Sequence, residues 1–176
     1  MIITVGGHIG SGKSTACKIL RERYLLNYSY SYTGQIFRDM AEERGLSIED
    51  FYAQMKADPD GEKAIDLRQA ERMNSENYLI VDGRMAAFQK TVFDMKRVLL
   101  TVNPEEGARR TMLREKKGKS LTQTLADNIK RANDERARYN SLYNIKDFLD
   151  PRHYDVVIDT TKIPAYEVAH RVYMAL

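Results

Sequence analysis

Residues 7–15, GHIGSGKST, have the residue types and spacing of a loop that binds phosphate groups. They complete the pattern G-x-x-x-x-G-K-[ST], whose glycines let backbone N–H groups surround phosphate oxygens. An apolar run precedes the loop and helix-forming residues follow it, so the N-terminus of a helix would add its positive dipole end. The loop residues expected to bind the phosphates are Gly7, Gly10, Ser11, Gly12, Lys13, Ser14 and Thr15. Lys13 would bridge the outer phosphates and the Ser14 hydroxyl would hold Mg²⁺, so a nucleoside triphosphate site is predicted.

A second candidate group, Asp82-Gly83-Arg84, directly follows the apolar run at residues 78–81. The run predicts a buried strand, and ligands gather at the carboxyl ends of the strands in an open α/β sheet. Asp82 would therefore join Ser14 in the Mg²⁺ shell, directly or through water. Arg84 could bind a phosphate through two parallel hydrogen bonds. A turn aspartate followed by a surface arginine is the alternative, and the nearby phosphate loop favours the functional interpretation.

A basic block could supply further charge for phosphoryl transfer. Ten Lys or Arg residues fall between positions 109 and 138, against four acids. Within the block, Arg131 and Arg138 lie seven residues apart, which is about 10.5 Å along one helix face. Arg110 and Arg114 are spaced i, i+4. An arginine next to a transferring phosphoryl group can raise the rate by roughly 10³–10⁵, but a solvated helix face or a nucleic-acid surface has the same composition.

Three more charged residues could bind the second substrate. Arg38 follows Phe37 and could hold a phosphate, while Phe37 could pack in the core or stack on a base. Asp66 and Arg68 lie two apart in a predicted helix, where both could line one groove. A carboxylate accepts from an exocyclic amine and a guanidinium donates to a ring carbonyl, and cytosine offers both groups. On spacing alone, solvated helix charges are the simpler interpretation of Asp66 and Arg68.

These groups require a scaffold of alternating strands and helices. The runs predicted to be strands are 1–5, 28–32, 78–81, 98–102 and 156–158, of which 28–32 is the weakest. All except 28–32 are apolar enough to be buried on both faces, and helical patterns separate them, so the sequence predicts a parallel sheet covered on both sides. Two helical blocks, about 34–76 and 109–143, exceed what a crossover needs. We expect both blocks to be insertions in a single domain of residues 1–176, each closing over one of two substrates.

The composition indicates a globular protein without membrane spans. Hydrophobic residues make up 43% and charged residues 30% of the 176 residues, and the net charge is +3. No apolar run is long enough to cross a bilayer, and the first residues lack a charged segment typical of secretion signals. Cys17 is the single cysteine, so no internal disulfide can form. We therefore expect a cytoplasmic protein, with Cys17 packed against the sheet.

Together these residues resemble the cytidylate kinase family, in particular its short, archaeal-type form. The resemblance covers nearly the whole chain, and it depends most on the segments after the phosphate loop. The matching segments are 7–15, 34–38, 58–59, 65–69, 82–84, 131–139 and 154–160. The family implies a P-loop nucleoside monophosphate kinase fold, in which an NMP-binding insertion at 34–76 and a LID at 109–143 flank a core. It also implies Mg²⁺-dependent transfer of the γ-phosphoryl group of ATP to CMP or dCMP.

The resemblance also assigns roles to individual residues. Lys13, Arg131 and Asp82 would be catalytic, with Ser14 and Asp82 at the metal. Those expected at the acceptor nucleotide are Arg38, Asp66, Arg68, Arg84 and Arg138. Arg110 would contact ATP, and Thr160 would lie by the adenine. We expect a monomer whose ligands are nucleotides, without nucleic-acid or membrane partners.

Departures from the family pattern leave other functions open. His8 and Ile9 replace the prolines common at the loop tip, and Gln35 stands where an acid is usual. Another NMP kinase, a small-metabolite kinase, and a non-catalytic nucleotide- or RNA-binding protein are the alternatives. Adenylate kinases carry D-G-x-P-R where this chain has Asp82-Gly83-Arg84-Met85, and shikimate-type kinases carry a D-x-D that residues 30–33 lack. These differences favour the cytidylate kinase interpretation.

Overall fold

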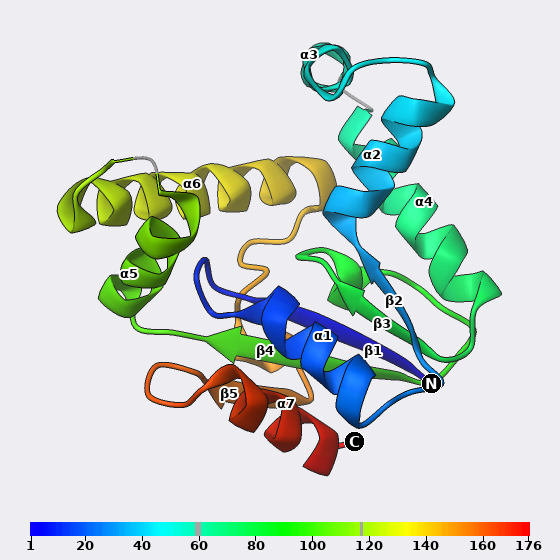
Figure 1. The fold of residues 1–176 in the computed structure, drawn as a ribbon. Coiled ribbons are helices and arrows are strands. Elements are labelled where there is room, and N and C mark those ends of the chain that lie inside the picture. Colours follow the sequence, from blue (N-terminus) through cyan, green and yellow to red (C-terminus); the bar gives the residue numbers. More distant parts are fainter. Residues whose placement is uncertain (59–60, 117) are drawn as a thin grey trace.

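Across residues 1–58, 61–116 and 118–176, which the computed structural model describes, five parallel strands form one sheet (Figure 1). The strands are β1 (Ile2–Gly7), β2 (Ser29–Tyr32), β3 (Leu79–Asp82), β4 (Met95–Thr101) and β5 (Val156–Asp159). Their order is β2-β3-β1-β4-β5. The strand carrying the phosphate loop therefore occupies the centre, next to the strand that ends in Asp82. The predicted parallel sheet of about five strands is confirmed, including the weaker strand near residue 30.

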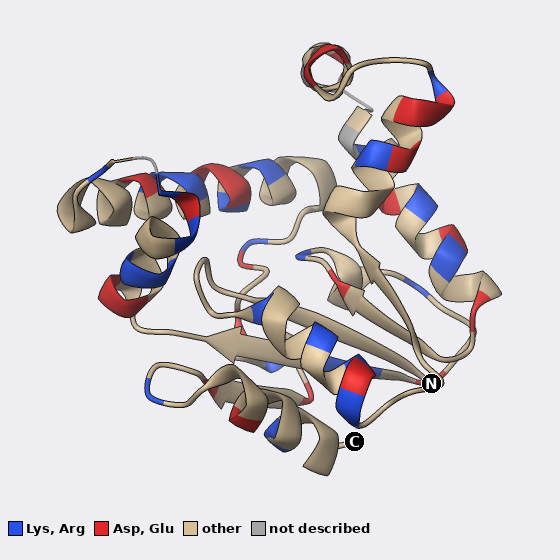
Figure 2. Ribbon diagram, viewed as in Figure 1, with Lys and Arg blue, Asp and Glu red and all other residues tan. Residues whose placement is uncertain are grey.

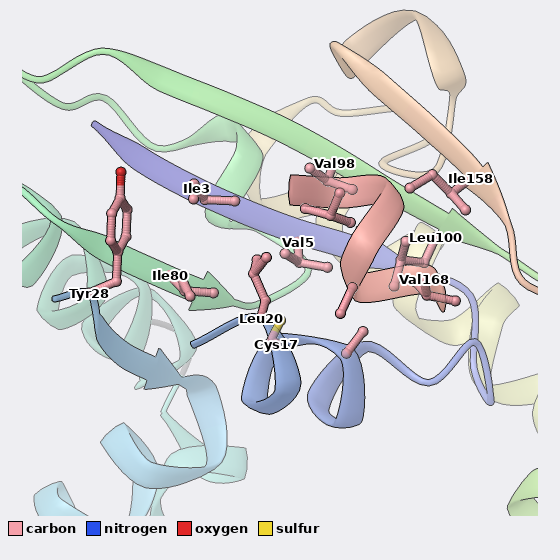
Figure 3. Packing of buried hydrophobic residues seen from close by; sticks show 13 residues of the cluster. Ile3, Val5, Cys17, Leu20, Tyr28, Ile80, Val98, Leu100, Ile158 and Val168 are labelled. Atoms are coloured by element: carbon pink, nitrogen blue, oxygen red, sulfur yellow. The ribbon is translucent and has the colours of Figure 1, made fainter. Parts of the chain in front are cut away.

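Helices cover both faces of this sheet, because side chains on successive strand residues point to opposite sides. Ile3 and Val5 of β1 pack with α1 (Lys13–Arg23) and α7 (Ala165–Met174), as Figure 3 shows. Cys17 of α1 is buried in the same cluster, as expected. On the opposite face, Ile2 packs with Met73 of α4 (Gly61–Ser75) and Ala86 of the short helix η1 (Ala86–Phe88). Burial on both faces accounts for the continuous apolar runs in these strands.

The outermost strand β5 differs from the prediction that its residues are buried on both faces. Ile158 lies in the core, but the side chain of Val157 is 46% exposed. The reason is its place at the edge of the sheet, where only β4 pairs with it. An apolar run of three residues cannot distinguish an edge strand from a central one.

Extra helices occupy the two predicted insertions. Between β2 and β3 lie α2 (Thr33–Glu43), α3 (Ile48–Ala57) and α4. Between β4 and β5 lie α5 (Pro104–Glu115), α6 (Leu121–Tyr143) and the short η2 (Pro151–His153). Pro59 and Lys117, which belong to predicted segments, lie outside the described residues.

Capping residues set the starts of these helices. The Ser47 hydroxyl accepts from the Asp50 N–H, and the Asn103 side chain accepts from the Glu105 N–H. Ser120 forms a capping box at the start of α6. Such caps satisfy backbone donors that the first helical turn leaves unpaired. Within the part of the chain that the structure describes, no helix combines the length and apolar character needed to cross a membrane.

The phosphate loop rests directly on the backbone of α5. A Cβ atom on Gly10 would lie 2.2 Å from the carbonyl oxygen of Gly107, and Gly10 has a φ of +78°. A Cβ atom on Gly107 would lie 2.7 Å from the carbonyl oxygen of Ile9. Both positions therefore require glycine, because a side chain at either one would push the loop away from the helix.

We predict that Gly107→Ala lowers the free energy of unfolding by about 1–3 kcal/mol, because the added methyl group overpacks this contact. Gly34→Ala is the matched control, since its Cβ would lie 3.5 Å from the Tyr32 ring, an ordinary contact distance. Urea denaturation measures both variants. Equal effects of the two substitutions would show that the contact between the loop and α5 does not constrain residue 107.

Candidate active site

The phosphate loop and Asp82 meet at the carboxyl edge of the sheet. Val5 of β1 pairs in register with Asp82 of β3, so the loop that follows β1 begins beside this carboxylate. The Ser14 hydroxyl donates to Asp82 Oδ2 at 2.5 Å. A hydroxyl and a carboxylate in contact suit Mg²⁺, which takes few protein oxygens and completes its shell with phosphate oxygens and water. Ser14 and Asp82 thus fit the metal that the sequence implied.

Lys13 lies buried within the loop. Its Nζ donates to the carbonyl oxygens of Gly7 at 2.9 Å and His8 at 3.0 Å. Burial, together with the nearby positive charge of Arg84, lowers the pKa of Lys13 to about 8, while Asp82 opposes this shift. Because these surroundings disfavour the charged ammonium group, the negative charge of a bound phosphate would stabilise it.

Two tyrosines of β2 support this cluster from one side. The Tyr30 hydroxyl donates to Asp82 Oδ2 at 3.2 Å. Burial raises the pKa of Tyr30 above its ordinary value, so this hydroxyl keeps its proton and remains a donor. The ring of Tyr32 stacks on that of Tyr30, with 5.4 Å between the ring centroids. The Tyr32 hydroxyl donates to the side-chain oxygen of Gln35 and accepts from the guanidinium of Arg38. Sequence reasoning missed both tyrosines, although their spacing in a strand places them on one face.

Glu135 of α6 joins two arginines that the sequence had placed at phosphates. Its Oε2 lies 2.6 Å from Arg84 Nε, and its Oε1 accepts from Arg131 Nε at 3.0 Å. The Glu135 side chain is only 8% exposed. A buried carboxylate that pairs two cations keeps their guanidinium groups together despite their repulsion. The i, i+4 spacing predicts the local pair of Glu135 with Arg131, whereas no sequence pattern indicated the contact with Arg84.

Four cavities adjoin this cluster in the part of the chain that the structure describes, and we name three of them donor, central and acceptor. The fourth, about 200 Å³, lies between the phosphate loop and α6 and has Gly7, Glu135 and Arg136 among its lining residues. The donor cavity, about 410 Å³, lies between the phosphate loop, α5 and the segment after β5. The central cavity, about 260 Å³, contains Lys13, Ser14, Asp82, Arg84 and Arg131 among its lining residues. The acceptor cavity, about 610 Å³, lies between α2, α3, α4 and the end of α6.

The three cavities share walls. Gly10 and Arg114 line both the donor and the central cavity. Thr33, Asp66 and Tyr139 line both the central and the acceptor cavity. The three spaces therefore follow one another across the carboxyl edge of the sheet, with the catalytic candidates in the middle. Arg114, which the sequence analysis paired with Arg110, lies at the first junction.

Arg110 and Thr160 lie together in the donor cavity. Arg110 Nη2 donates to the carbonyl oxygens of Thr160 at 2.8 Å and Thr161 at 3.2 Å, and its Nε donates to Glu106 at 2.7 Å. The Thr160 hydroxyl in turn donates to the carbonyl oxygen of Ser11 at 3.1 Å. These contacts connect α5, the segment after β5 and the phosphate loop around one cavity.

Asp66 and Arg138 line the acceptor cavity, but Arg68 does not. Arg68 Nη2 pairs with Glu43 Oε1 at 2.6 Å, and both side chains are about half exposed, at 52% and 54%. The expectation that Asp66 and Arg68 line one groove is therefore wrong for this structure. Residues two apart in a helix point in directions about 200° apart, so one of them faces away.

The architecture identifies the class of protein. A parallel sheet whose central strand leads into this loop and a helix is that of P-loop proteins. A family model described as "AAA domain" matches residues 3–140. The structure of shikimate kinase from Acinetobacter baumannii, solved with shikimate, superposes with a TM-score of 0.59 at 18% identity. The superposition covers 97% of this chain and 89% of that one, so this chain has the fold of P-loop kinases.

Sequence similarity identifies the family within that class. The cytidylate kinase of Pyrococcus abyssi is 35% identical over 162 residues, which cover 92% of this chain and 86% of that protein. The cytidylate kinase of Methanococcus maripaludis (strain C7) is 33% identical over 177 residues, covering 100% of this chain and 97% of that protein. The chain therefore belongs to the cytidylate kinase family, as its motifs predicted, and it is a phosphotransferase.

We predict that ATP binding takes up a proton at about pH 8.5. In the free protein the pKa of Lys13 is about 8, and a bound triphosphate would raise it by stabilising the charged ammonium. At a pH between the pKa of Lys13 in the free protein and its higher pKa in the complex, Lys13 therefore takes up a proton when ATP binds. For the same reason, the affinity for ATP falls as the pH rises above 8. Isothermal titration calorimetry in two buffers of different ionisation enthalpy measures the uptake.

Lys13→Arg is the control for this measurement, because a guanidinium group stays charged throughout this pH range. The uptake should disappear in that variant. If the wild type and Lys13→Arg take up the same number of protons, another group is responsible.

We predict that Glu135→Gln destabilises the free protein by about 1–3 kcal/mol, because it leaves two clustered arginines without their carboxylate. Added sulfate should raise the melting temperature of this variant more than that of the wild type, since an anion can replace the lost charge. Glu167→Gln, which removes an exposed pair with Arg171 on α7, is the control. Equal sulfate effects in all three proteins would contradict a charge-holding role for Glu135.

Proposed function

We propose that this protein transfers the γ-phosphoryl group of ATP to CMP or dCMP in the presence of Mg²⁺. The observation that carries the proposal is the row of three joined cavities, whose middle member contains a phosphate loop and clustered arginines. The membership of the cytidylate kinase family supports the choice of acceptor. In this assignment, the donor cavity takes ATP and the acceptor cavity takes the monophosphate.

Residues of the donor and central cavities would hold ATP and its metal ion. The backbone N–H groups of the loop and Lys13 would bind its phosphates. The segment at Thr160, held by Arg110, would form the wall beside the adenine. Ser14 and Asp82 would hold Mg²⁺, which neutralises charge on the phosphates when bound.

Arginines would position the acceptor phosphate and stabilise the transfer. Arg38, Arg84 and Arg138 would hold the acceptor phosphate, and Arg131 would stabilise charge on the group in flight. The acceptor phosphate is already an anion at neutral pH, so no strong general base is needed. Catalysis then consists of alignment and charge neutralisation by side chains fixed in advance. Glu135 would keep Arg84 and Arg131 near the transfer site before nucleotides bind.

The charge distribution of α5 and α6 supports nucleotides over RNA as ligands. Figure 2 shows acidic segments interspersed with basic ones along these helices. The pairs in this region include Arg109–Glu106, Arg110–Glu106, Arg114–Glu115, Lys119–Asp127, Arg131–Glu135 and Arg136–Asp147. A surface that binds a nucleic-acid backbone needs cations that phosphates can reach. Here, many of the cations of the basic block are neutralised by neighbours.

The proposal predicts ADP release from ATP and Mg²⁺ with CMP and dCMP, at a kcat/KM above that for AMP, GMP and UMP. A panel of monophosphates in a coupled ADP assay measures this. Arg131→Ala should lower kcat by roughly 10²–10³ with little change in KM, because it acts on charge that develops in the transition state.

Arg136→Ala is the matched control for the arginine substitution. Arg136 lies on the same helix but pairs with Asp147. It lines none of the donor, central and acceptor cavities, and contributes only to the fourth cavity. Its kcat should stay within a factor of about two of the wild type. An absence of phosphoryl transfer to every monophosphate, together with salt-dependent RNA binding, would contradict the proposal and favour a nucleic-acid function.

A further inference from the structure

A hydrogen bond joins the two helical insertions at the acceptor cavity. The hydroxyl of Tyr143 donates to Asp66 Oδ2 at 2.6 Å, although the residues are 77 positions apart. Tyr143 is the last residue of α6, and Asp66 lies in α4. Figure 1 shows the C-terminal end of α6 reaching the helices between β2 and β3. No motif in the sequence pointed to this contact.

The position of Tyr143 is fixed by the end of its helix. Asn144 adopts the left-handed conformation, with φ of 56°, and ends α6 directly after Tyr143. One turn earlier, the ring of Tyr139 packs edge-on against Phe148, which is buried in the core. The ring centroids of Tyr139 and Tyr143 lie 6.5 Å apart. The phenol hydroxyl is therefore presented to α4 from a rigid support.

Asp66 is the carboxylate at the boundary of the central and acceptor cavities. A carboxylate accepts hydrogen bonds and donates none, so it attracts an exocyclic amine and repels a carbonyl oxygen at the same place. This discrimination needs a fixed orientation, because a carboxylate free to rotate could turn away from the wrong base. Arg68, which the sequence analysis placed beside Asp66, instead pairs with Glu43.

We infer that Tyr143 is a positioning residue for acceptor-base selection, which holds the Asp66 carboxylate in orientation to accept from an exocyclic amine. This inference rests on the proposed function, in which Asp66 accepts a hydrogen bond from the amino group of a cytosine base. Because the two residues come from different insertions, base selection depends on the contact between α6 and α4.

The test is the ratio of kcat/KM for CMP to kcat/KM for UMP in Tyr143→Phe, which removes only the hydroxyl. Loss of a hydrogen bond to a charged group should lower kcat/KM for CMP roughly tenfold, while that for UMP stays the same or rises. The ratio then falls roughly tenfold. In an Asp66→Ala background, Tyr143→Phe should leave the ratio unchanged, because the group that it positions is gone.

Tyr166→Phe is the control, since Tyr166 lies on α7, is 60% exposed and lines none of the three cavities. Its ratio should equal that of the wild type. Equal losses for CMP and UMP in Tyr143→Phe would overturn the inference, because they would show that the hydroxyl only holds α6 against α4. A wild type that phosphorylates no monophosphate would overturn the proposed function and the inference with it, and the assay reports this before any variant is compared.

Discussion

The site depends on keeping like charges close together in a partly buried space. Burial lowers the pKa of Lys13, and the nearby positive charge of Arg84 lowers it further. Asp82 and Glu135 offset this repulsion, the first at the phosphate loop and the second from α6. Arginine keeps its charge in such surroundings, whereas lysine can lose it. The two carboxylates thus offset the positive charge of the cluster, and phosphates would compete with them for the cationic side chains.

The sheet makes this balance possible, because parallel strands bring all their carboxyl ends to one edge. The loop after β1 and the Asp82 carboxylate at the end of β3 come from neighbouring strands, so Ser14 and Asp82 meet although 68 residues separate them. The close contact between Gly10 and Gly107 ties the loop to α5, the first helix after β4. A movement of α5 would therefore reach the phosphate loop through backbone atoms. The helices inserted after β4 can therefore affect the loop without touching bound phosphates.

Local sequence patterns predicted the frame, and long-range contacts escaped them. The phosphate loop and the central strands follow from periodicity and from residues adjacent in the chain, which is why they were found. Tyr30 and Tyr143 have partners far away in sequence, as does Glu135 in its pair with Arg84, and no spacing rule connects these pairs. The error at Arg68 has a local cause, since a two-residue separation in a helix sends one side chain outward. The exposure of Val157 depended on strand order, which one strand cannot reveal.

The most direct test of the account is a structure with adenosine and cytidine joined through a single chain of phosphates. We predict that the adenosine occupies the donor cavity, the cytidine occupies the acceptor cavity, and the phosphate chain contacts Lys13, Arg84 and Arg131. The compound should also bind more tightly than ATP or CMP alone, because one molecule makes both sets of contacts. A complex in which either nucleoside lies outside these cavities, with the arginines turned away from the phosphates, would contradict the account.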